Sequence, residues 1–160
     1  MDSKLFFIQK KGDSHLRLYS KEEYEAFFGI TYLPTPYFAS KEQLLELKQN
    51  CPWLLLHTFF GEEHRSLGAY LHTSLNTGKV ADVSIRWIDE DVGYGLFAEN
   101  LIAKESFIGQ YTGIVRKNAS IVNGYCIQIP TKFWSFRRFI LDAETAGNEL
   151  RFANHSDTPS

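Results

Sequence analysis

Near its carboxyl end the chain reads Gly147-Asn148-Glu149-Leu150-Arg151-Phe152-Ala153-Asn154-His155-Ser156. Two glycine-containing stretches precede it, Gly93-Tyr94-Gly95-Leu96-Phe97-Ala98 and Gly109-Gln110-Tyr111-Thr112-Gly113. Each stretch has an ordinary structural explanation by itself. Asn and Ser side chains stabilise turns by bonding to nearby backbone groups, and glycine is frequent in tight turns. The order of the three stretches along one chain is the more specific feature.

The composition favours one folded domain. The chain has 160 residues, of which 44% are hydrophobic and 15% aromatic, enough to fill a single core. A formal net charge of -2 and an isoelectric point near 6.2 leave no broad basic surface for nucleic acid or an anionic membrane. Any basic partner must therefore be bound locally.

Cysteine usage and apolar runs are also informative. Cys51 and Cys126 lie far apart and lack the paired spacing of a zinc site, so we expect two reduced thiols and no metal. The apolar run Leu5–Ile8 is too short for a signal peptide. No stretch approaches the roughly 20 apolar residues of a membrane helix. We therefore expect no membrane interaction and a cytoplasmic location.

The front of the chain carries helix signals. Ser20 with Glu23 forms the pattern of a capping box, and Gly29 follows as a stop, which predicts a helix up to Phe28. Ser40 with Gln43 predicts a second helix that ends before Pro52. Residues 1–79 are thus expected to form an N-terminal flanking region with short helices and no recognisable chemistry.

From Val80 onward the pattern changes to short β-branched and aromatic runs broken by Gly and Asn. The predicted strands are Ala81–Ile88, Phe107–Val115, Tyr125–Ile129 and Phe139–Leu141. Such short strands favour small sheets over alternating strands and long helices. The expected fold class is mainly β with some α, with residues 80–160 as the second domain.

The glycines and Tyr111 allow two interpretations from chemistry alone. Gly93 and Gly95 can mark a hairpin turn, or they can let a ligand approach the backbone closely. The Gly-x-Gly lacks the third glycine and the helix of a dinucleotide-binding fingerprint. Tyr111 can fill the core as a cross-strand aromatic residue, or it can line a narrow substrate channel.

Read in order, the three stretches resemble the SET domain, the fold that transfers a methyl group from S-adenosylmethionine to a protein lysine. Ile102-Ala103-Lys104 and Ile140-Leu141-Asp142-Ala143 stand where the family has similar segments. The resemblance covers about residues 82–159. It implies a SET fold of small β-sheets, and it implies a protein-lysine N-methyltransferase that uses S-adenosylmethionine as its cofactor.

The resemblance also implies roles for individual residues. Tyr111 would point its hydroxyl into the lysine channel and is the candidate catalytic residue. Asn154 would engage the amino-acid end of the cofactor, and His155 would contact adenine without acting as a base. The insert strand would pair with the substrate peptide. The implied cofactor-binding residues are Gly93, Tyr94, Gly95, Arg151, Phe152, Asn154 and His155. The implied substrate-binding residues are Tyr125, Ile127 and Gln128.

The chemistry explains why aromatic walls would be useful. A lysine must be neutral to attack a sulfonium methyl, yet its reference pKa is about 10.4. Partial desolvation in an apolar channel disfavours the ammonium form. In-line positioning would then supply most of the acceleration, without a metal or a dedicated general base.

The sequence departs from the family at its end. Asp157 stands where many members have Cys, which argues against the zinc-binding appendage of some eukaryotic members. The carboxyl-terminal segment that forms a knot and supplies a second tyrosine is missing, so we expect a truncated version of a longer protein. The chain looks similar to short SET proteins of intracellular bacteria such as chlamydiae. This would make it a bacterial effector acting on chromatin, in the bacterial nucleoid or in a host nucleus.

The expected partner is a Lys-rich protein, a histone or a histone-like protein, and a homodimer is an open option. The alternative function is a catalytically inactive SET-like module that binds a protein or peptide. A further aromatic and arginine cluster could stack nucleic-acid bases, but two Arg residues in an acidic chain give this little support. That cluster comprises Phe133, Trp134, Phe136, Arg137 and Arg138.

Overall fold

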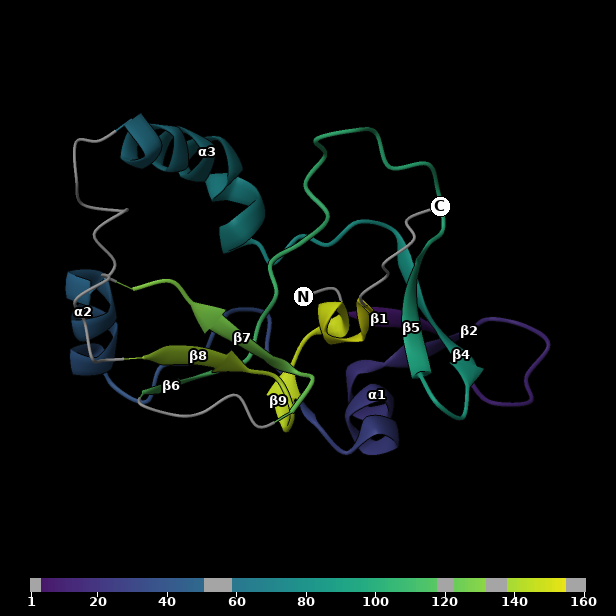
Figure 1. Cartoon of the computed structure of the whole chain (residues 1–160). Coiled ribbons are helices and arrows are strands. Elements are labelled where there is room, and N and C mark those ends of the chain that lie inside the picture. The colour runs from purple at the N-terminus through teal and green to yellow at the C-terminus, as the bar shows by residue number, and fades with distance from the viewer. Residues whose placement is uncertain (1–3, 51–58, 118–122, 132–137, 155–160) are drawn as a thin grey trace.

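The structure is a computed structural model that describes residues 4–50, 59–117, 123–131 and 138–154. Three small sheets and three α-helices make up the described part, so the fold is mainly β with some α, as predicted (Figure 1). The largest sheet stands beside the 3-10 helix η2 (Glu149–Phe152), which carries part of the carboxyl-terminal motif. No helix in the described ranges is long and apolar enough to cross a membrane.

The four-stranded sheet combines both halves of the chain in the order β2-β1-β4-β5. Strand β1 pairs antiparallel with β2 and parallel with β4, and β4 pairs antiparallel with β5. The bounds are β1 Leu5–Gln9, β2 Arg17–Ser20, β4 Val83–Asp89 and β5 Gly93–Ala98.

The sheet of β6, β8 and β7 lies on the left of Figure 1 beside α2, and β9 lies between it and the four-stranded sheet. Strand β8 pairs antiparallel with β6 and with β7, which leaves β7 at an edge of its sheet. The short strands β3 and β9 pair in parallel. The bounds are β3 Thr31–Tyr32, β6 Ile114–Lys117, β7 Cys126–Ile129, β8 Phe139–Asp142 and β9 Ala146–Gly147.

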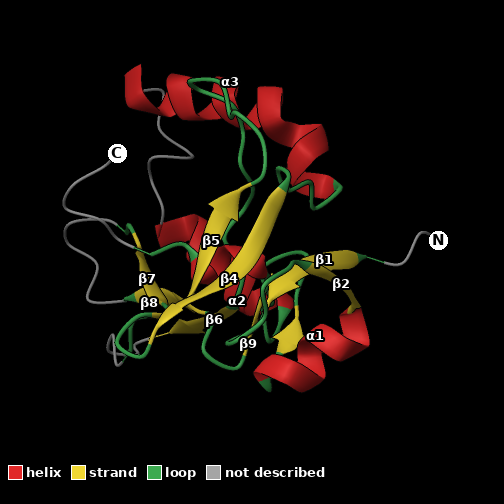
Figure 2. Cartoon of the chain, turned by 90° about the vertical axis from the view of Figure 1, so that its right-hand side faces the viewer, coloured by secondary structure: helices red, strands yellow, loops and turns green. Residues whose placement is uncertain are grey.

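Helix α1 (Lys21–Phe28) confirms the predicted capping box. The Ser20 hydroxyl accepts from the Glu23 amide, the Glu23 carboxylate accepts from the Ser20 amide, and Gly29 ends the helix at a φ of 66°. The second predicted helix is α2 (Lys41–Asn50). Helix α3 (Phe59–Asn76) was not predicted, and Figures 1 and 2 both place it at the top of the view, away from α1.

The core follows from the alternation of side chains along β1. Phe6 and Ile8 are buried while their neighbours Leu5 and Phe7 are half exposed, as expected for a strand with one face covered. The buried face packs against aromatic rings from α1, β3 and η2. The residues of this cluster are Phe6, Ile8, Tyr24, Ile30, Tyr32, Ile85 and Phe152. A second cluster joins Val115, Phe139 and Leu141 from β6 and β8.

Two parts of the structure differ from the sequence-based expectations. Residues 1–79 contribute β1, β2 and β3 in addition to helices, and β1 and β3 pair with strands from residues 80–160. The predicted strand Phe107–Val115 is wrong over most of its length, because only β6 is a strand. The residues before β6 bond instead to the extended connection after β3: Thr112 donates its hydroxyl to the Leu33 carbonyl, and the Tyr37 amide donates to Gly113.

Candidate functional site

The glycine pair lies in the β4–β5 hairpin. Asp89 accepts hydrogen bonds at its carboxylate from the amides of Asp91 and Val92, which tightens the turn. Gly93 then starts β5 at a φ of 77°, a left-handed conformation that favours glycine. Both interpretations of the glycines are compatible with this structure, because the hairpin is real and Gly93 also lines a pocket.

The carboxyl-terminal motif forms η2. The Asn148 side chain caps this helix by accepting from the Leu150 amide, and it donates to the Gln110 carbonyl. Arg151 is buried and donates to the carbonyls of Ala143 and Glu144. These bonds fix the direction in which the chain leaves η2. Asn154 follows, and its amide nitrogen lies 3.4 Å from the Tyr94 carbonyl oxygen.

A pocket of about 280 Å³ lies where η2 meets β5. Half of its lining residues are aromatic, and the lining also includes one buried guanidinium and one amide. The lining residues are Phe28, Val92, Gly93, Tyr94, Tyr125, Arg151, Phe152 and Asn154. The accessible lining is more polar than apolar, so the pocket combines aromatic rings with hydrogen-bonding groups.

Gly95 leaves room for the Asn154 side chain at this pocket. A Cβ atom at position 95 would lie 3.2 Å from Asn154 Nδ2 and 2.6 Å from Ile88 Cδ1. The bare backbone therefore lets the Asn154 amide lie against β5. Aromatic rings can stack on a flat ligand, and an amide and a carbonyl can hydrogen-bond to it.

Tyr111 and Tyr125 connect this pocket to the sheet formed by β6, β8 and β7. The Tyr111 hydroxyl donates to the Tyr125 carbonyl at 2.9 Å, and the Arg151 guanidinium carbon lies 4.1 Å from the centre of the Tyr125 ring. Burial raises the pKa of Tyr111 to about 12, although the nearby Arg151 lowers it in part. Tyr111 is therefore a neutral hydrogen-bond donor at neutral pH.

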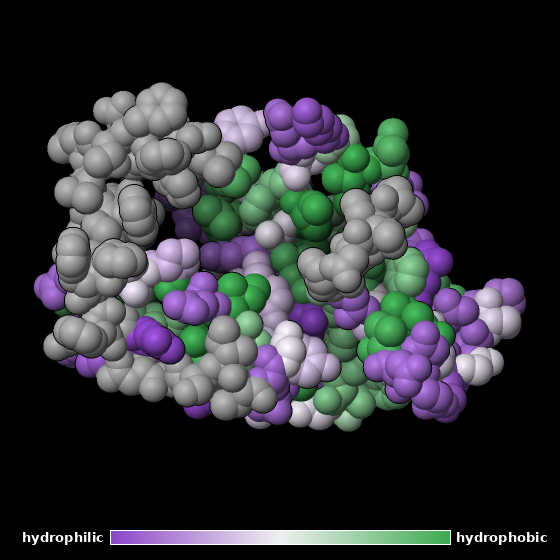
Figure 3. All heavy atoms as spheres, viewed as in Figure 1, coloured by the Kyte–Doolittle hydropathy of each residue, from purple (hydrophilic) through white to green (hydrophobic). Residues whose placement is uncertain are grey.

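A larger hollow of about 440 Å³ shares Asn154 with this pocket. Apolar side chains of β5 and of the loop after it dominate its lining, and Figure 3 shows hydrophobic residues gathered over this part of the face. The lining residues are Val83, Leu96, Phe97, Ala98, Ile102, Ile108, Gly109, Tyr111, Leu150, Ala153 and Asn154. Tyr111 and Asn154 thus stand near a second, apolar surface.

The predicted substrate residues lie at or just before β7. Ile127 and Gln128 are exposed, and no other strand of the described part pairs with the outer edge of β7. On its inner side β7 pairs with β8, which ends at Asp142. Burial alone would raise the pKa of Asp142. Hydrogen bonds from the Glu144 amide and from Arg116 outweigh burial and hold this pKa below its usual value.

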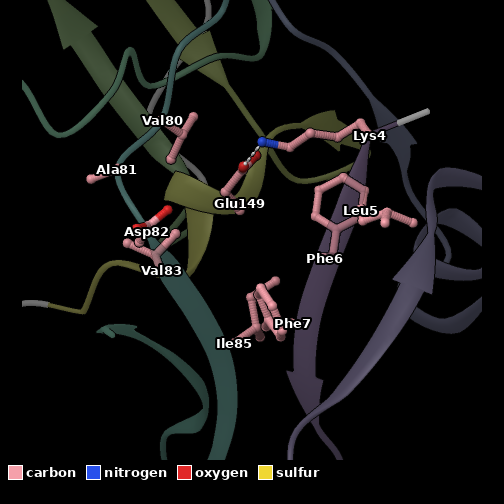
Figure 4. Close-up of a pocket in the computed structure, with 10 residues that line it drawn as sticks. All are labelled: Lys4, Leu5, Phe6, Phe7, Val80, Ala81, Asp82, Val83, Ile85 and Glu149. Atoms are coloured by element: carbon pink, nitrogen blue, oxygen red, sulfur yellow. Dashed lines mark ion pairs between the residues drawn. The ribbon is translucent and has the colours of Figure 1, made fainter. Parts of the chain in front are cut away.

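A smaller hollow of about 140 Å³ lies between β1 and β4. In Figure 4 the Lys4 side chain reaches across it toward Glu149 of η2, and Lys4 Nζ lies 2.7 Å from Glu149 Oε1. The other carboxylate oxygen of Glu149 is buried and has no hydrogen-bond partner among the described residues. This ion pair ties the first strand to the motif helix.

The structure brings most of the predicted site residues together. Gly93, Tyr94, Arg151, Phe152 and Asn154 line one pocket, and Gly95 lies directly behind Asn154. His155 and residues 133–137 of the arginine-aromatic cluster lie outside the described residues. Within the described ranges, no group of three or more His, Cys, Asp or Glu side chains is placed to hold a metal ion.

Two contributions to the site were missed by sequence reasoning. Phe28 lines the pocket from α1. Tyr125 was predicted only as a substrate-binding residue, but its ring also lines the pocket beside Arg151. Neither contact could be read from spacing, because the partners lie far apart in the chain. The only signal for Phe28 was its position as the last residue before the Gly29 stop.

Comparison with known proteins agrees with the motifs. Residues 93–160, less than half of the chain, match the family model of the SET domain. The chain is 31% identical over 72 residues to the histone-lysine N-methyltransferase EZA1 of Arabidopsis thaliana. It is also 31% identical over 77 residues to the histone-lysine N-methyltransferase CLF of the same plant.

These alignments are partial. They cover 42% and 46% of this chain, and the chain spans only 8% of the length of either relative. Among solved structures, the fold is similar to that of ATXR5 in a complex with histone H3.1 mono-methylated on R26, with a TM-score of 0.52 and 15% identity. That similarity covers 85% of this chain and 66% of ATXR5, so the shared fold extends into the front half of this chain.

Proposed function

We propose that this chain belongs to an S-adenosylmethionine-dependent protein-lysine N-methyltransferase that acts on a histone or a histone-like protein. The observation that carries the proposal is the meeting of the Gly93–Gly95 strand with Asn154 at one aromatic-walled pocket. The match of residues 93–160 to the SET domain supports the same assignment. The bacterial origin and the effector role expected from the sequence stay predictions.

Several residues would hold the cofactor. Asn154 offers an amide and Tyr94 a carbonyl at the pocket, while Arg151 is held in the wall by two carbonyls. Phe152 packs beside Tyr94 with ring centres 6.3 Å apart. The role of His155 at adenine remains a prediction of the family resemblance. When bound, S-adenosylmethionine supplies a methyl group on a positively charged sulfur.

Tyr111 would act at the substrate lysine. Its hydroxyl is neutral at physiological pH and already donates to the Tyr125 carbonyl, so it cannot serve as a general base there. Its half-buried ring would instead disfavour the charged ammonium by partial desolvation. The hydroxyl would orient the amine, and positioning would supply most of the acceleration.

The substrate peptide would bind along β7. An exposed strand edge presents unpaired backbone groups to which an extended peptide can add as a further strand. Tyr125, Ile127 and Gln128 would then contact the peptide. A histone-type substrate is supported by the names of the curated relatives, which are histone-lysine N-methyltransferases, and by the histone H3.1 bound in the ATXR5 structure.

Calorimetric titration of S-adenosylmethionine into the 160-residue chain tests the proposal. We expect binding that Asn154→Ala weakens by about tenfold or more, which corresponds to about 1.4 kcal/mol. Asn100→Ala is the matched control, because the Asn100 amide bonds to Asp82 on an exposed loop outside the pocket. Binding should be unchanged in that variant.

A second titration with a histone H3 tail peptide separates the alternatives. Binding of both S-adenosylmethionine and the peptide supports the methyltransferase. Peptide binding with no measurable affinity for S-adenosylmethionine would overturn it in favour of the inactive binding module.

A further inference from the structure

We propose that Phe28 of α1 is a cofactor-positioning residue, although it lies outside the segment that matches the SET domain. This inference rests on the proposed function, because it assigns Phe28 to the pocket that would hold S-adenosylmethionine. Phe28 lines that pocket together with Tyr94, Phe152 and Asn154. The helix before the SET segment would thus complete the binding site.

The ring of Phe28 is held by aromatic neighbours on two elements of the site. Its centre lies 5.2 Å from the Tyr94 ring at 90° and 4.6 Å from the Phe152 ring at 46°. Within α1 it also lies 5.2 Å from the buried Tyr24 ring. Edge-to-face and tilted contacts at these distances are favourable for aromatic pairs. The Phe28 ring is therefore fixed relative to β5 and η2.

The end of α1 is fixed as well, so the ring cannot easily leave the pocket. The Gly29 amide donates to the Glu25 carbonyl, and the Glu25 carboxylate accepts from the Tyr32 amide of β3. Strand β3 in turn pairs with β9, a few residues before η2. A continuous set of hydrogen bonds thus links the position of Phe28 to the motif helix.

The chemistry of the wall indicates which part of the ligand Phe28 would contact. Arg151 brings positive charge to the pocket and lies over the rings of Tyr125 and Phe152, at 4.1 and 5.0 Å. A second cation is disfavoured close to it. The side chains of Phe28 and Tyr94 are uncharged. They would therefore contact the uncharged part that S-adenosylmethionine and its demethylated product have in common. Phe28 should then stabilise both ligands equally.

The test compares Phe28→Ala, Phe28→Leu and the control Phe27→Ala by calorimetric titration with S-adenosylmethionine and with S-adenosylhomocysteine. Phe27 is in the same helix and contacts the Tyr94 ring at 5.8 Å, but it does not line the pocket. We expect Phe28→Ala to weaken the binding of both ligands by about tenfold. This is near the lower end of the range of effects for removing an aromatic stacking surface. Phe27→Ala should change neither affinity by more than about twofold.

Phe28→Leu separates a ligand contact from a purely structural role. Leucine keeps apolar volume in the cluster, so the melting temperature without ligand should stay close to that of the parent chain. Both affinities should still fall several-fold, because the flat ring is lost. Parent-like binding by Phe28→Leu would overturn the proposal, and so would a loss confined to S-adenosylmethionine.

Asn154→Ala, titrated in parallel, distinguishes this failure from failure of the proposed function. Binding by the parent chain that Asn154→Ala weakens and Phe28→Leu does not would reject only the role of Phe28. Absence of binding by the parent chain would reject the cofactor site itself, and the role of Phe28 with it.

Discussion

Gly95 shows how a residue without a side chain shapes the site. The Asn154 amide lies where a side chain at position 95 would reach, and the Tyr94 carbonyl next to Gly95 is its hydrogen-bond partner. The two motifs that were most separate in the sequence therefore meet at one backbone position. This contact explains why a glycine is useful here even though its backbone needs no left-handed conformation.

We predict that Gly95→Ala lowers the affinity for S-adenosylmethionine by about tenfold, since the new Cβ would push the Asn154 amide away from β5. The tip of Ile88 can move aside more easily, because it is the flexible end of an exposed side chain. Calorimetric titration measures the change. Gly124→Ala is the control, since its Cβ would meet nothing within 4 Å. Equal affinities for the parent and Gly95→Ala would contradict the contact.

At the level of elements, β7 is the strand on which substrate binding depends. The Ala143 amide donates to the Tyr125 carbonyl, so the backbone of Tyr125 faces the inner side of the sheet. Backbone groups alternate along an antiparallel strand. The amides of Cys126 and Gln128 should therefore face away from β8. The Cys126 amide already donates to the Asn123 carbonyl, so the Gln128 amide is the donor that a peptide added at the outer edge would use.

We predict that Gln128→Pro weakens binding of a histone H3 tail peptide at least fivefold, because proline removes an outward amide donor. The effect on the fold should be small, since proline is tolerated at strand edges. Gln128→Ala is the control, as it keeps the amide and removes only the side chain. Fluorescence anisotropy of a labelled peptide measures both. The affinity of Gln128→Pro for S-adenosylmethionine should be unchanged, and a parallel loss there would indicate a disturbed fold instead.

Local signals and long-range pairing explain which elements the sequence predicted. The α1 capping box depends on Ser20, Glu23 and Gly29, which lie close together in the chain, and it was confirmed. Strand β1 was missed because its run Leu5–Ile8 resembles any short apolar segment until its parallel pairing with β4 is known. The predicted strand before β6 was too long. The backbone there bonds to Tyr37, which comes from a different part of the chain.

The same distinction holds for the site. Asn154 and the glycines were found because a family pattern connects them, whereas the place of Phe28 depends on how α1 packs against β5. Tyr111 was singled out by the same pattern, and its role stays a prediction. Its hydrogen bond to Tyr125 links residues from two loops and has no counterpart in local spacing. Pairwise packing between distant segments is the part that one sequence does not reveal.

Across the whole molecule, the Lys4–Glu149 ion pair joins the first strand to the motif helix. The Glu149 side chain is only 4% exposed and that of Lys4 36%. Burial and the charge of Glu149 raise the pKa of Tyr24 beside the core, as expected near a buried carboxylate. Losing Lys4 would leave that carboxylate in the interior without its counter-ion.

We predict that Lys4→Met lowers the free energy of unfolding by about 1–3 kcal/mol, less than for a fully buried pair because Lys4 is partly exposed. The double variant Lys4→Met/Glu149→Gln should recover part of this loss, since the uncompensated charge is gone. Urea denaturation measures both. Lys11→Met is the control: its pair with Glu90 is exposed, so the change should be within about 0.5 kcal/mol. Equal effects for the two lysines would contradict a buried role for Lys4.

The parallel pairing of β1 with β4 also constrains how the protein is made. Residues 5–9 leave the ribosome well before their partner strand at residues 83–89 is synthesised. Until then β1 has only β2 beside it, and an isolated two-stranded hairpin is at best marginally stable in water. The apolar residues Leu5–Ile8 would stay accessible to chaperones or to neighbouring chains until residues 83–89 have been made, so the sheet that supports the pocket cannot close before then.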